Sequence, residues 1–126
     1  MTAINLPPKW EQSSRTQTNQ VIALPMKEGY RLVDQESIVY CKAEGNYTLV
    51  FFVNGNTMLI SRKLKQTAAS LENAWFLRIH QSYLVNMRHA QLYLRKSGGQ
   101  LVMANGEKLP ISKNYKELVL QFFKIV

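Results

Sequence analysis

The sequence predicts a β-dominated α+β domain, in which mostly antiparallel short strands form small sheets, with one short internal helix and a C-terminal helix. Three observations support this prediction. The apolar runs are as short as strands, Asn-Gly pairs separate some of them, and two segments have the apolar spacing of a helix. The chain has 126 residues, 46% of them hydrophobic, which is enough for one domain with a buried core.

The first 20 residues differ from the rest of the chain. They contain Pro7-Pro8 and a polar run over residues 11–20 that has no apolar period. We therefore expect a flexible arm, or the remnant of a linker, over residues 1–20 and a folded domain over residues 21–126. The first strands of this domain are predicted at 21–26, 30–33, 38–43, 47–53 and 57–61.

Two Asn-Gly pairs indicate tight hairpin turns. Asn54-Gly55 and Asn105-Gly106 each lie between two apolar runs. Both residue types tolerate the positive φ angles that such turns require. We expect hairpins at both pairs and a similar turn at Ser97-Gly98-Gly99, which places the later strands at 91–96, 100–104 and 108–111.

The internal helix is predicted over residues 63–71. Its apolar residues recur at the spacing of one helix face: Leu64, Ala68 and Leu71. The opposite face carries Lys63 and Lys65. Ser61 is the expected N-cap, because a serine hydroxyl can accept a bond from a free N–H group of the first turn.

The second helix closes the chain. Its apolar residues form one stripe over three turns: Tyr115, Leu118, Val119, Phe122 and Ile125. Ser112 is the expected N-cap, which places Lys113 and Asn114 in the exposed first turn.

Between the two helices, one segment breaks the apolar pattern. The apolar run that begins at Phe76 is interrupted at residues 78–82, Arg-Ile-His-Gln-Ser, and is then apolar again up to Asn86. Polar side chains in such a break must be satisfied internally or offered to a partner. We interpret Arg78 as an anchor that binds nearby backbone or a carboxylate, and Asn86 as the cap of a turn.

The net charge of +8 is unevenly distributed. The segment from Arg62 to Lys96 contains seven basic residues and one acid, Glu72, whereas residues 21–59 contain three basic and four acidic residues. Clustered positive charge in a chain with a pI of about 9.8 indicates a polyanionic partner. Nucleic acid is favoured over an anionic membrane surface.

Other classes of protein have little support. The apolar runs are far shorter than a membrane span, and residues 1–20 lack the pattern of a secretory signal. Cys41, the sole cysteine, excludes an intrachain disulfide and fits a reducing compartment such as the cytoplasm. Two histidines and one cysteine do not make a zinc site, and no glycine-rich phosphate loop is present. We expect no enzyme activity, no metal, no cofactor, no membrane association and no small-molecule substrate.

Four motifs, taken in order, resemble a known family. Residues 38–47 are Ile-Val-Tyr-Cys-Lys-Ala-Glu-Gly-Asn-Tyr, and Ser61-Arg-Lys-Leu64 opens the internal helix. Phe76-x-Arg-Ile-His-x-Ser-Tyr-Leu-Val-Asn86 follows, and Asn105-Gly106 with Leu109-Pro-Ile-Ser112 leads into the last helix. This set is similar to a LytTR-type DNA-binding domain and covers residues 21–126. The resemblance implies a domain of bacterial transcription regulators, including response regulators of two-component systems, whose loops enter the DNA grooves.

The resemblance also implies that three loops contact DNA: residues 44–47, the break after His80, and the junction before the last helix. It assigns base contact to one residue in each loop: Tyr47, Gln81 and Lys113. Their neighbours would contact the DNA backbone: Asn46, His80, Ser82 and Asn114. Arg is common in the family where this chain has Gln81 and Lys113, so we expect a different preferred DNA sequence.

Basic residues outside these loops are expected to contact phosphates: Arg62, Lys63, Lys65 and Arg88. An ordinary solvated helix face would explain Lys63 and Lys65 equally well. Tyr47 alternates with Leu49 and Phe51 and could belong to the core instead, and His80 could be a packing residue.

We therefore expect sequence-specific binding to double-stranded DNA by a bacterial transcription regulator, with a second copy as a further partner on repeated half-sites. Two other hypotheses stay open. One is a protein-interaction module with a basic face, and the other is single-stranded nucleic-acid binding on a β platform that includes Tyr47 and Phe51. The sequence also leaves open whether the chain is a stand-alone regulator or a fragment cut near residue 20.

Overall fold

The computed structural model describes residues 21–71 and 75–126. The expected arm at residues 1–20 lies outside them. The strands and helices are β1 (Val21–Met26), β2 (Gly29–Asp34), β3 (Ile38–Glu44), β4 (Tyr47–Phe52), β5 (Thr57–Ile60), α2 (Leu64–Ser70), β6 (Phe76–His80), β7 (Tyr83–Asn86), β8 (Ala90–Leu94), β9 (Gln100–Met103), β10 (Lys108–Pro110) and α3 (Lys113–Phe122).

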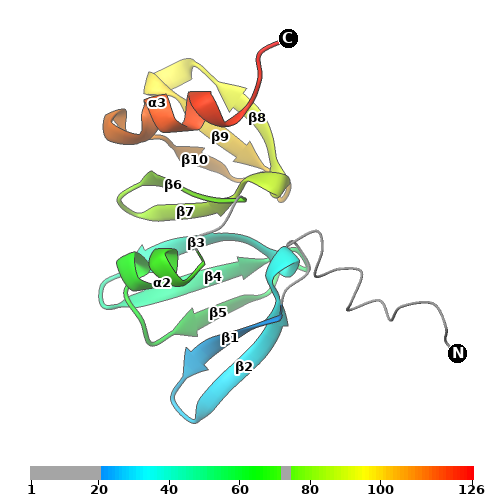
Figure 1. Cartoon of the computed structure of the whole chain (residues 1–126), viewed down its shortest axis with the longest axis vertical. Helices are drawn as coiled ribbons and strands as arrows, with labels where there is room; N and C mark the ends of the chain where they lie inside the picture. The colour runs from blue at the N-terminus through cyan, green and yellow to red at the C-terminus, as the bar shows by residue number, and fades with distance from the viewer. Residues whose placement is uncertain (1–20, 72–74) are drawn as a thin grey trace, which may run out of the picture.

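The strands form three antiparallel sheets that follow one another along the long axis of the molecule (Figure 1). A hairpin of β1 and β2 lies at one end, and a sheet in the order β10-β9-β8 lies at the other. Between them is a five-stranded sheet in the order β5-β4-β3-β7-β6. The predicted fold class, with small antiparallel sheets, one internal helix and a C-terminal helix, is confirmed.

Both Asn-Gly pairs form the expected hairpin turns. Gly55 and Gly106 each have a φ of 90°, a left-handed conformation that glycine adopts without strain. In each turn the asparagine side chain accepts a bond from the backbone two residues further on, which is the usual asparagine turn. The distances are 2.9 Å from Asn54 Oδ1 to the nitrogen of Asn56 and 3.1 Å from Asn105 Oδ1 to the nitrogen of Glu107.

The polar break in the apolar run at 76–86 is also a hairpin turn. β6 ends at His80, residues 81 and 82 form the turn, and β7 returns antiparallel from Tyr83. The register shifts between Arg78 and His80, so one residue bulges out of the ladder there. The polar residues are therefore held at a sheet edge, where their side chains can reach solvent or a partner.

Each face of the five-stranded sheet covers a separate core. Cys41 and Leu84 face the core under the β1–β2 hairpin and α2, and both are buried. Tyr40 and Val85 face the core under α3 and the three-stranded sheet. Neighbouring residues along a strand point to opposite faces, so β3 and β7 contribute to both cores at once. The domain thus depends on the five-stranded sheet as its central layer.

The two helices differ from the predictions at their ends. Lys63, rather than Ser61, is the N-cap of α2, and its backbone N–H donates to the side chain of Gln66 at 3.4 Å. Residue 61 was an incorrect choice because the chain is still leaving β5 there, and its N–H donates to the carbonyl of Pro25. Ser112 is the N-cap position of α3, but its side chain makes no capping bond.

The apolar stripe of α3 is narrower than predicted. Val119 is fully buried, and Phe122 packs its ring against Trp75 with centroids 6.0 Å apart. Leu118 is 46% exposed and Ile125 is 77% exposed, so neither belongs to the core. The helix ends at Phe122, which takes Ile125 out of the helical period, and α3 packs on β6 along one narrow face.

Candidate nucleic-acid interface

Three loops that are distant in the sequence meet at one edge of the five-stranded sheet. The β3–β4 turn lies beside the β6–β7 turn, because the backbone N–H of Ala43 donates to the carbonyl of Ser82 at 2.9 Å. The start of α3 lies beside the end of β6, because the N–H of Ser112 donates to the carbonyl of Ile79 at 3.0 Å. Figure 1 shows all three along the left side of the molecule. We call this side, along which the strands of the sheet end or begin, the loop edge.

The junction between β5 and α2 extends the loop edge past β4. Thr48, the residue after Tyr47, pairs with the last residue of β5, and its hydroxyl donates to the carbonyl of Arg62 at 2.7 Å. This bond fixes the junction beside the start of β4. The expected phosphate contacts there have exposed side chains: Arg62, Lys63 and Lys65.

The β6–β7 turn is held by its own polar side chains. Arg78 donates from Nε to the carbonyl of His80 at 3.0 Å and from Nη2 to the carbonyl of Gln81 at 2.7 Å. His80 Nδ1 accepts from the backbone N–H of Ser82 at 3.0 Å, and its ring meets Tyr83 edge-on. The interpretation of Arg78 as a backbone anchor is confirmed. The side chain of Gln81 is exposed at the tip of this rigid turn.

Tyr47 is at the surface rather than in the core. It is 49% exposed, whereas Thr48 and Val50 on the same strand are buried. Gly45 has a φ of 61° in the turn before it, which lets β3 reverse into β4 within two residues. Asn46 is exposed in the same turn. The alternative assignment of Tyr47 to the core is therefore wrong.

The first turn of α3 completes the loop edge. Lys113 and Asn114 are exposed, as expected. Lys116 is exposed as well and lies three residues after Lys113, so it shares the same helix face. Lys116 was not among the predicted contacts, although the helical period of the last segment places it on this face.

Arg88 lies away from the other predicted contacts, at the opposite end of β7. Its Nε donates to the carboxylate of Glu36 at 2.9 Å, and its guanidinium lies 4.7 Å from the centre of the Trp75 ring. Asn86 is buried there, with its Nδ2 donating to the carbonyl of Ile38 at 3.0 Å and its Oδ1 accepting from the N–H of Arg88. The interpretation of Asn86 as a turn cap is confirmed. The predicted contact of Arg88 with DNA is untested; because Arg88 is paired with Glu36 at the opposite end of β7, we expect it to act in stability rather than in DNA binding.

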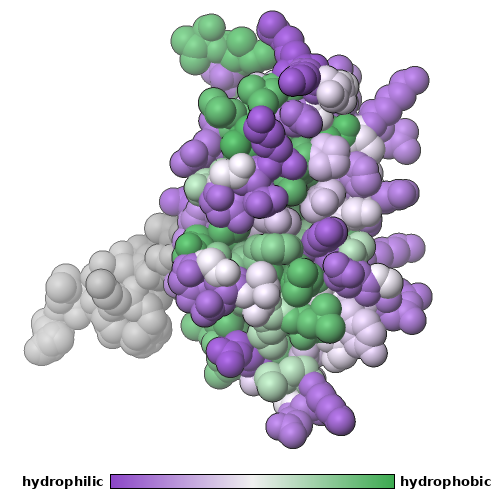
Figure 2. All heavy atoms as spheres, turned by 180° about the vertical axis from the view of Figure 1, so that it is seen from behind, coloured by the Kyte–Doolittle hydropathy of each residue, from purple (hydrophilic) through white to green (hydrophobic). Residues whose placement is uncertain are grey.

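The loop edge is hydrophilic, and within the described part of the chain Arg62, Lys63, Lys65 and Lys113 take part in no ion pair. The ion pairs found in the described residues join Glu36 to Arg88 and to His89, both at the opposite end. Figure 2 shows the molecule from behind, and long hydrophilic side chains project along its right side, which is the loop edge. The basic side chains there are therefore available to a polyanion.

Two buried groups near the sheet centre stay neutral. Burial raises the pKa of the Cys41 thiol to about 12. Burial, and to a lesser degree Glu107 and Tyr83, raise the pKa of the Tyr40 hydroxyl to about 12. Neither group adds charge to the surface at neutral pH. The ring of Tyr40 stacks on Phe51 with centroids 4.2 Å apart, so Phe51 is not free to act as a stacking platform.

Within the described ranges, no three His, Cys, Asp or Glu side chains are grouped so that they could hold a metal ion. In those same ranges, no helix is long and apolar enough to cross a membrane.

Comparison with known proteins agrees with this arrangement. The family model of the LytTr DNA-binding domain matches residues 28–124. The chain belongs to the LytTR family. One relative is the CO-responsive transcriptional regulator RcoM of Rhodospirillum rubrum, 32% identical over 95 residues that cover 73% of this chain and 40% of that protein. Another is the sensory transduction protein LytT of Bacillus anthracis, 30% identical over 112 residues that cover 82% and 43%.

A solved LytTr DNA-binding domain from Bacillus cereus has the same fold, with a TM-score of 0.71 and 24% sequence identity. The match covers 83% of this chain and 97% of that one. The chain spans less than half the length of the curated LytTR relatives that it matches. Residues 28–124 therefore correspond to a LytTr DNA-binding domain.

Proposed function

We propose that this LytTR domain binds a specific double-stranded DNA sequence through its loop edge. The observation that carries the proposal is the meeting of the β3–β4 turn, the β6–β7 turn and the start of α3 at one side of one sheet. Each loop is rooted in a strand or helix that packs on a core, so its exposed tip is held in a fixed position. Fixed, exposed polar side chains are what base recognition requires.

The size of the loop edge fits a duplex. Five strands end or begin along it, and neighbouring strands are about 4.8 Å apart, so the row is roughly 19 Å long. The major groove of B-DNA is about 12 Å wide. A row of this length therefore reaches across one groove and onto a flanking backbone. The basic junction at 62–65 and the start of α3 lie at the two ends of the row.

The proposed base contacts lie on separate loops. The Gln81 amide can pair with the N6 and N7 atoms of adenine, and the Lys113 ammonium can donate to O6 or N7 of guanine. The exposed Tyr47 ring would contact base edges beside them. Because the residues are on different loops, each should determine a different base pair.

The proposed backbone contacts surround them. The free N–H groups and partial positive charge at the start of α3 suit a phosphate next to Asn114. His80 accepts through Nδ1, so its neutral form carries the proton on Nε2 and can donate to a phosphate. Further contacts come from Asn46, Arg62, Lys63, Lys65 and Ser82.

We further propose that the domain is the DNA-binding part of a cytoplasmic bacterial transcription regulator. The relatives named above are a transcriptional regulator and a sensory transduction protein. A regulator of this kind, a two-component response regulator included, would use a second copy to occupy a repeated half-site.

The test is selection of binding sites from random duplex pools, followed by competition titrations with variants. Gln81→Ala and Lys113→Ala should each cost about 1–3 kcal/mol on the selected site and far less on random duplex. Gln91→Ala and Lys124→Ala are matched controls, because both side chains are exposed but lie away from the loop edge. Both controls should bind like the wild type.

The same titrations separate the alternatives. Equal losses on selected and random duplex would make both residues phosphate contacts and would refute the proposed base recognition. Preference for single strands over any duplex would favour the β platform instead, and failure to bind DNA at low salt would favour a protein partner.

A further inference from the structure

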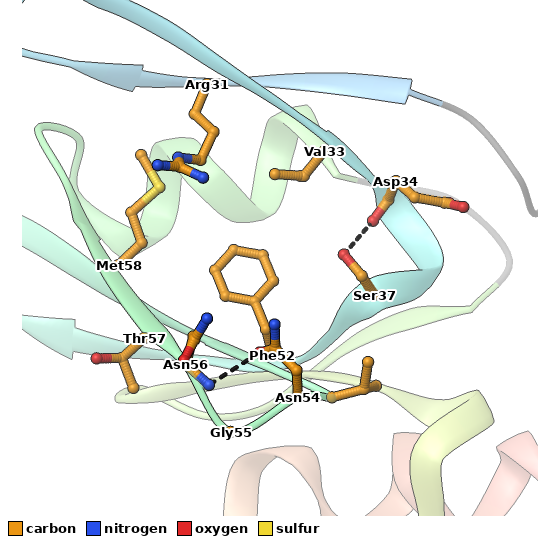
Figure 3. A pocket seen from close by; sticks show the side chains of 11 residues that line it. Arg31, Val33, Asp34, Ser37, Phe52, Asn54, Gly55, Asn56, Thr57 and Met58 are labelled. Carbon is orange, nitrogen blue, oxygen red and sulfur yellow. Dashed lines mark hydrogen bonds between the residues drawn. The ribbon is translucent and has the colours of Figure 1, made fainter.

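A second candidate site lies outside the loop edge. A cleft of about 740 Å³ opens between β2, the turn after it and the β4–β5 hairpin (Figure 3). Sites for small molecules commonly have volumes of about 300–1,000 Å³. The lining combines apolar and polar side chains, among them Arg31, Val33, Ser37, Phe52, Asn56 and Met58.

The cleft is separate from the proposed DNA contacts. Phe52, which lines the cleft, is at the end of β4, whereas Tyr47 is at the start of the same strand. Five residue steps along a strand span roughly 16 Å. A duplex on the loop edge would therefore leave the cleft open, and the two sites can be tested independently.

One end of the cleft presents an unpaired cation. The Arg31 side chain projects into the space toward Met58 (Figure 3). The ion pairs found in the described residues do not include Arg31, and no hydrogen bond of its guanidinium is recorded there. A guanidinium presents a planar fork of donors that matches a carboxylate, so its free donors favour an anionic group.

At the other end of the cleft, the polar groups of Asp34 and Ser37 already form hydrogen bonds within the protein. Asp34 Oδ1 accepts from the N–H of Glu36 at 3.0 Å, and the Ser37 hydroxyl donates to the carbonyl of Asp34 at 2.6 Å. Among the described residues that line the cleft, Asp34 is the one acid. Its charge would repel a second negative group, so a ligand with a single anionic end fits best.

We propose that this cleft binds a small aromatic carboxylate. The carboxylate pairs with the Arg31 guanidinium, and the ring lies on the half-buried Phe52 between Val33 and Met58. Aromatic and thioether side chains both pack favourably against an aromatic ring. This ligand-binding activity is additional to the proposed DNA binding and does not depend on DNA binding.

The probe is phenylacetate, titrated into the full chain while backbone amide shifts are followed by NMR. Saturable shifts should be confined to amides around the cleft, at Arg31 and residues 52–58. The neutral analogue 2-phenylethanol, which keeps the ring but lacks the carboxylate, should bind at least about tenfold more weakly. Acetate, which lacks the ring, should give no saturable shifts there.

Variants decide the role of the guanidinium. Arg31→Gln should weaken phenylacetate at least about tenfold, and Arg31→Lys should lie between it and the wild type. The control is Arg95→Gln, an exposed arginine after β8, which should leave the affinity unchanged. The dispersion of each spectrum verifies that the variant is folded.

Three results of the ligand titrations would overturn the proposal. These are no shifts in the cleft, equal binding of phenylacetate and 2-phenylethanol, and shifts that lie on the loop edge and disappear at high salt. Unchanged affinity in a folded Arg31→Gln variant would also overturn it. Selected-site DNA binding by the same variant should match the wild type, so a failure of one proposal is distinguishable from a failure of the other.

Discussion

Basic residues lie at both ends of the five-stranded sheet, but lysines at one end are exposed and outside the ion pairs of the described residues, whereas Arg88 at the other end is paired. At the loop edge, Lys63 and Lys113 are exposed, and the ion pairs found in the described residues do not include them. At the opposite end, Arg88 is paired with Glu36 and lies over Trp75. A basic residue at the loop edge can pair with a DNA phosphate without losing an ion pair, whereas Arg88 would first have to break its contacts with Glu36 and Trp75.

The comparison shows that a count of cations does not locate an interface. The basic segment from Arg62 to Lys96 includes Arg78, whose guanidinium holds two carbonyls of the β6–β7 turn, and Arg88 at the far end. Both contribute to the net charge, yet both already have internal partners. The surface for a polyanion is defined by the cations that lack them.

The largest expected effect is the salt dependence of the loop edge as a whole. If its cations contact phosphates, the logarithm of affinity should fall with the logarithm of salt with a slope of roughly −4 to −7, or ~10²–10⁴-fold between 50 and 200 mM. Fluorescence anisotropy of a labelled duplex over a KCl series measures this slope. A salt-independent affinity would contradict the assignment of the loop edge to DNA.

The opposite end should instead control stability. Asn86→Ala leaves the carbonyl of Ile38 and the N–H of Arg88 without a partner in a buried site, which should cost roughly 1–3 kcal/mol in the free energy of unfolding. Asn105→Ala, in an exposed turn, is the matched control with a smaller cost. Denaturant titration gives both values. A variant as stable as the wild type would show that these bonds are dispensable.

Arg78 has features of both ends of the sheet. It is a cation at the loop edge, but its guanidinium is bonded to two backbone carbonyls of the β6–β7 turn. Arg78→Ala should weaken the selected site about tenfold by releasing the β6–β7 turn, while the salt slope stays unchanged. Arg78→Lys keeps the charge but lacks the fork, so it should recover only part of the affinity. A slope lowered by about one would mean that Arg78 contacts a phosphate directly.

Substitutions of single basic residues allow a direct comparison of the two ends of the sheet. Lys63→Ala or Lys65→Ala should weaken all duplexes alike and lower the salt slope by about one. Arg88→Ala should leave the slope unchanged and alter unfolding by no more than ~1 kcal/mol, because its ion pair is exposed to solvent. If Arg88→Ala lowers the slope instead, the duplex reaches the opposite end and the distinction fails.

The smallest effect at neutral pH concerns the centre of the sheet. The folded pKa of Cys41 is raised to about 12 from an ordinary value of 9.0, so the folded state holds this proton more tightly. Its contribution to stability is complete below pH 9 and is lost as the pH rises toward 12, with Tyr40 acting in the same direction above pH 10. Cys41→Ala should reduce this loss of stability, which is measured as the free energy of unfolding at a series of pH values.

Alkylation gives a second measurement of the same thiol. Iodoacetamide should react slowly with native Cys41 at pH 8–9 and rapidly once guanidinium unfolds the chain. Equal rates in both states would show that the residue is not buried as described.

Much of the candidate site could be predicted because its parts are local. The Asn-Gly turns of the fold, and the break after Phe76 and the basic start of α3 at the candidate site, each depend on residues within a few positions of one another. The ends of the helices were less predictable. The N-cap of α2 moved from Ser61 to Lys63 because β5 continues toward Pro25, a contact with a distant strand.

The sequence by itself determined the strands, most turns, the separation of charge along the chain and the family. Tertiary structure decided which loops meet, whether Tyr47 is buried, and which arginines are already paired. These outcomes depend on bonds between distant segments, such as that of Ala43 with Ser82 and that of Arg88 with Glu36, which are 52 positions apart. Local sequence patterns fix the conformation of each segment, but the partner of a polar group depends on how the segments pack.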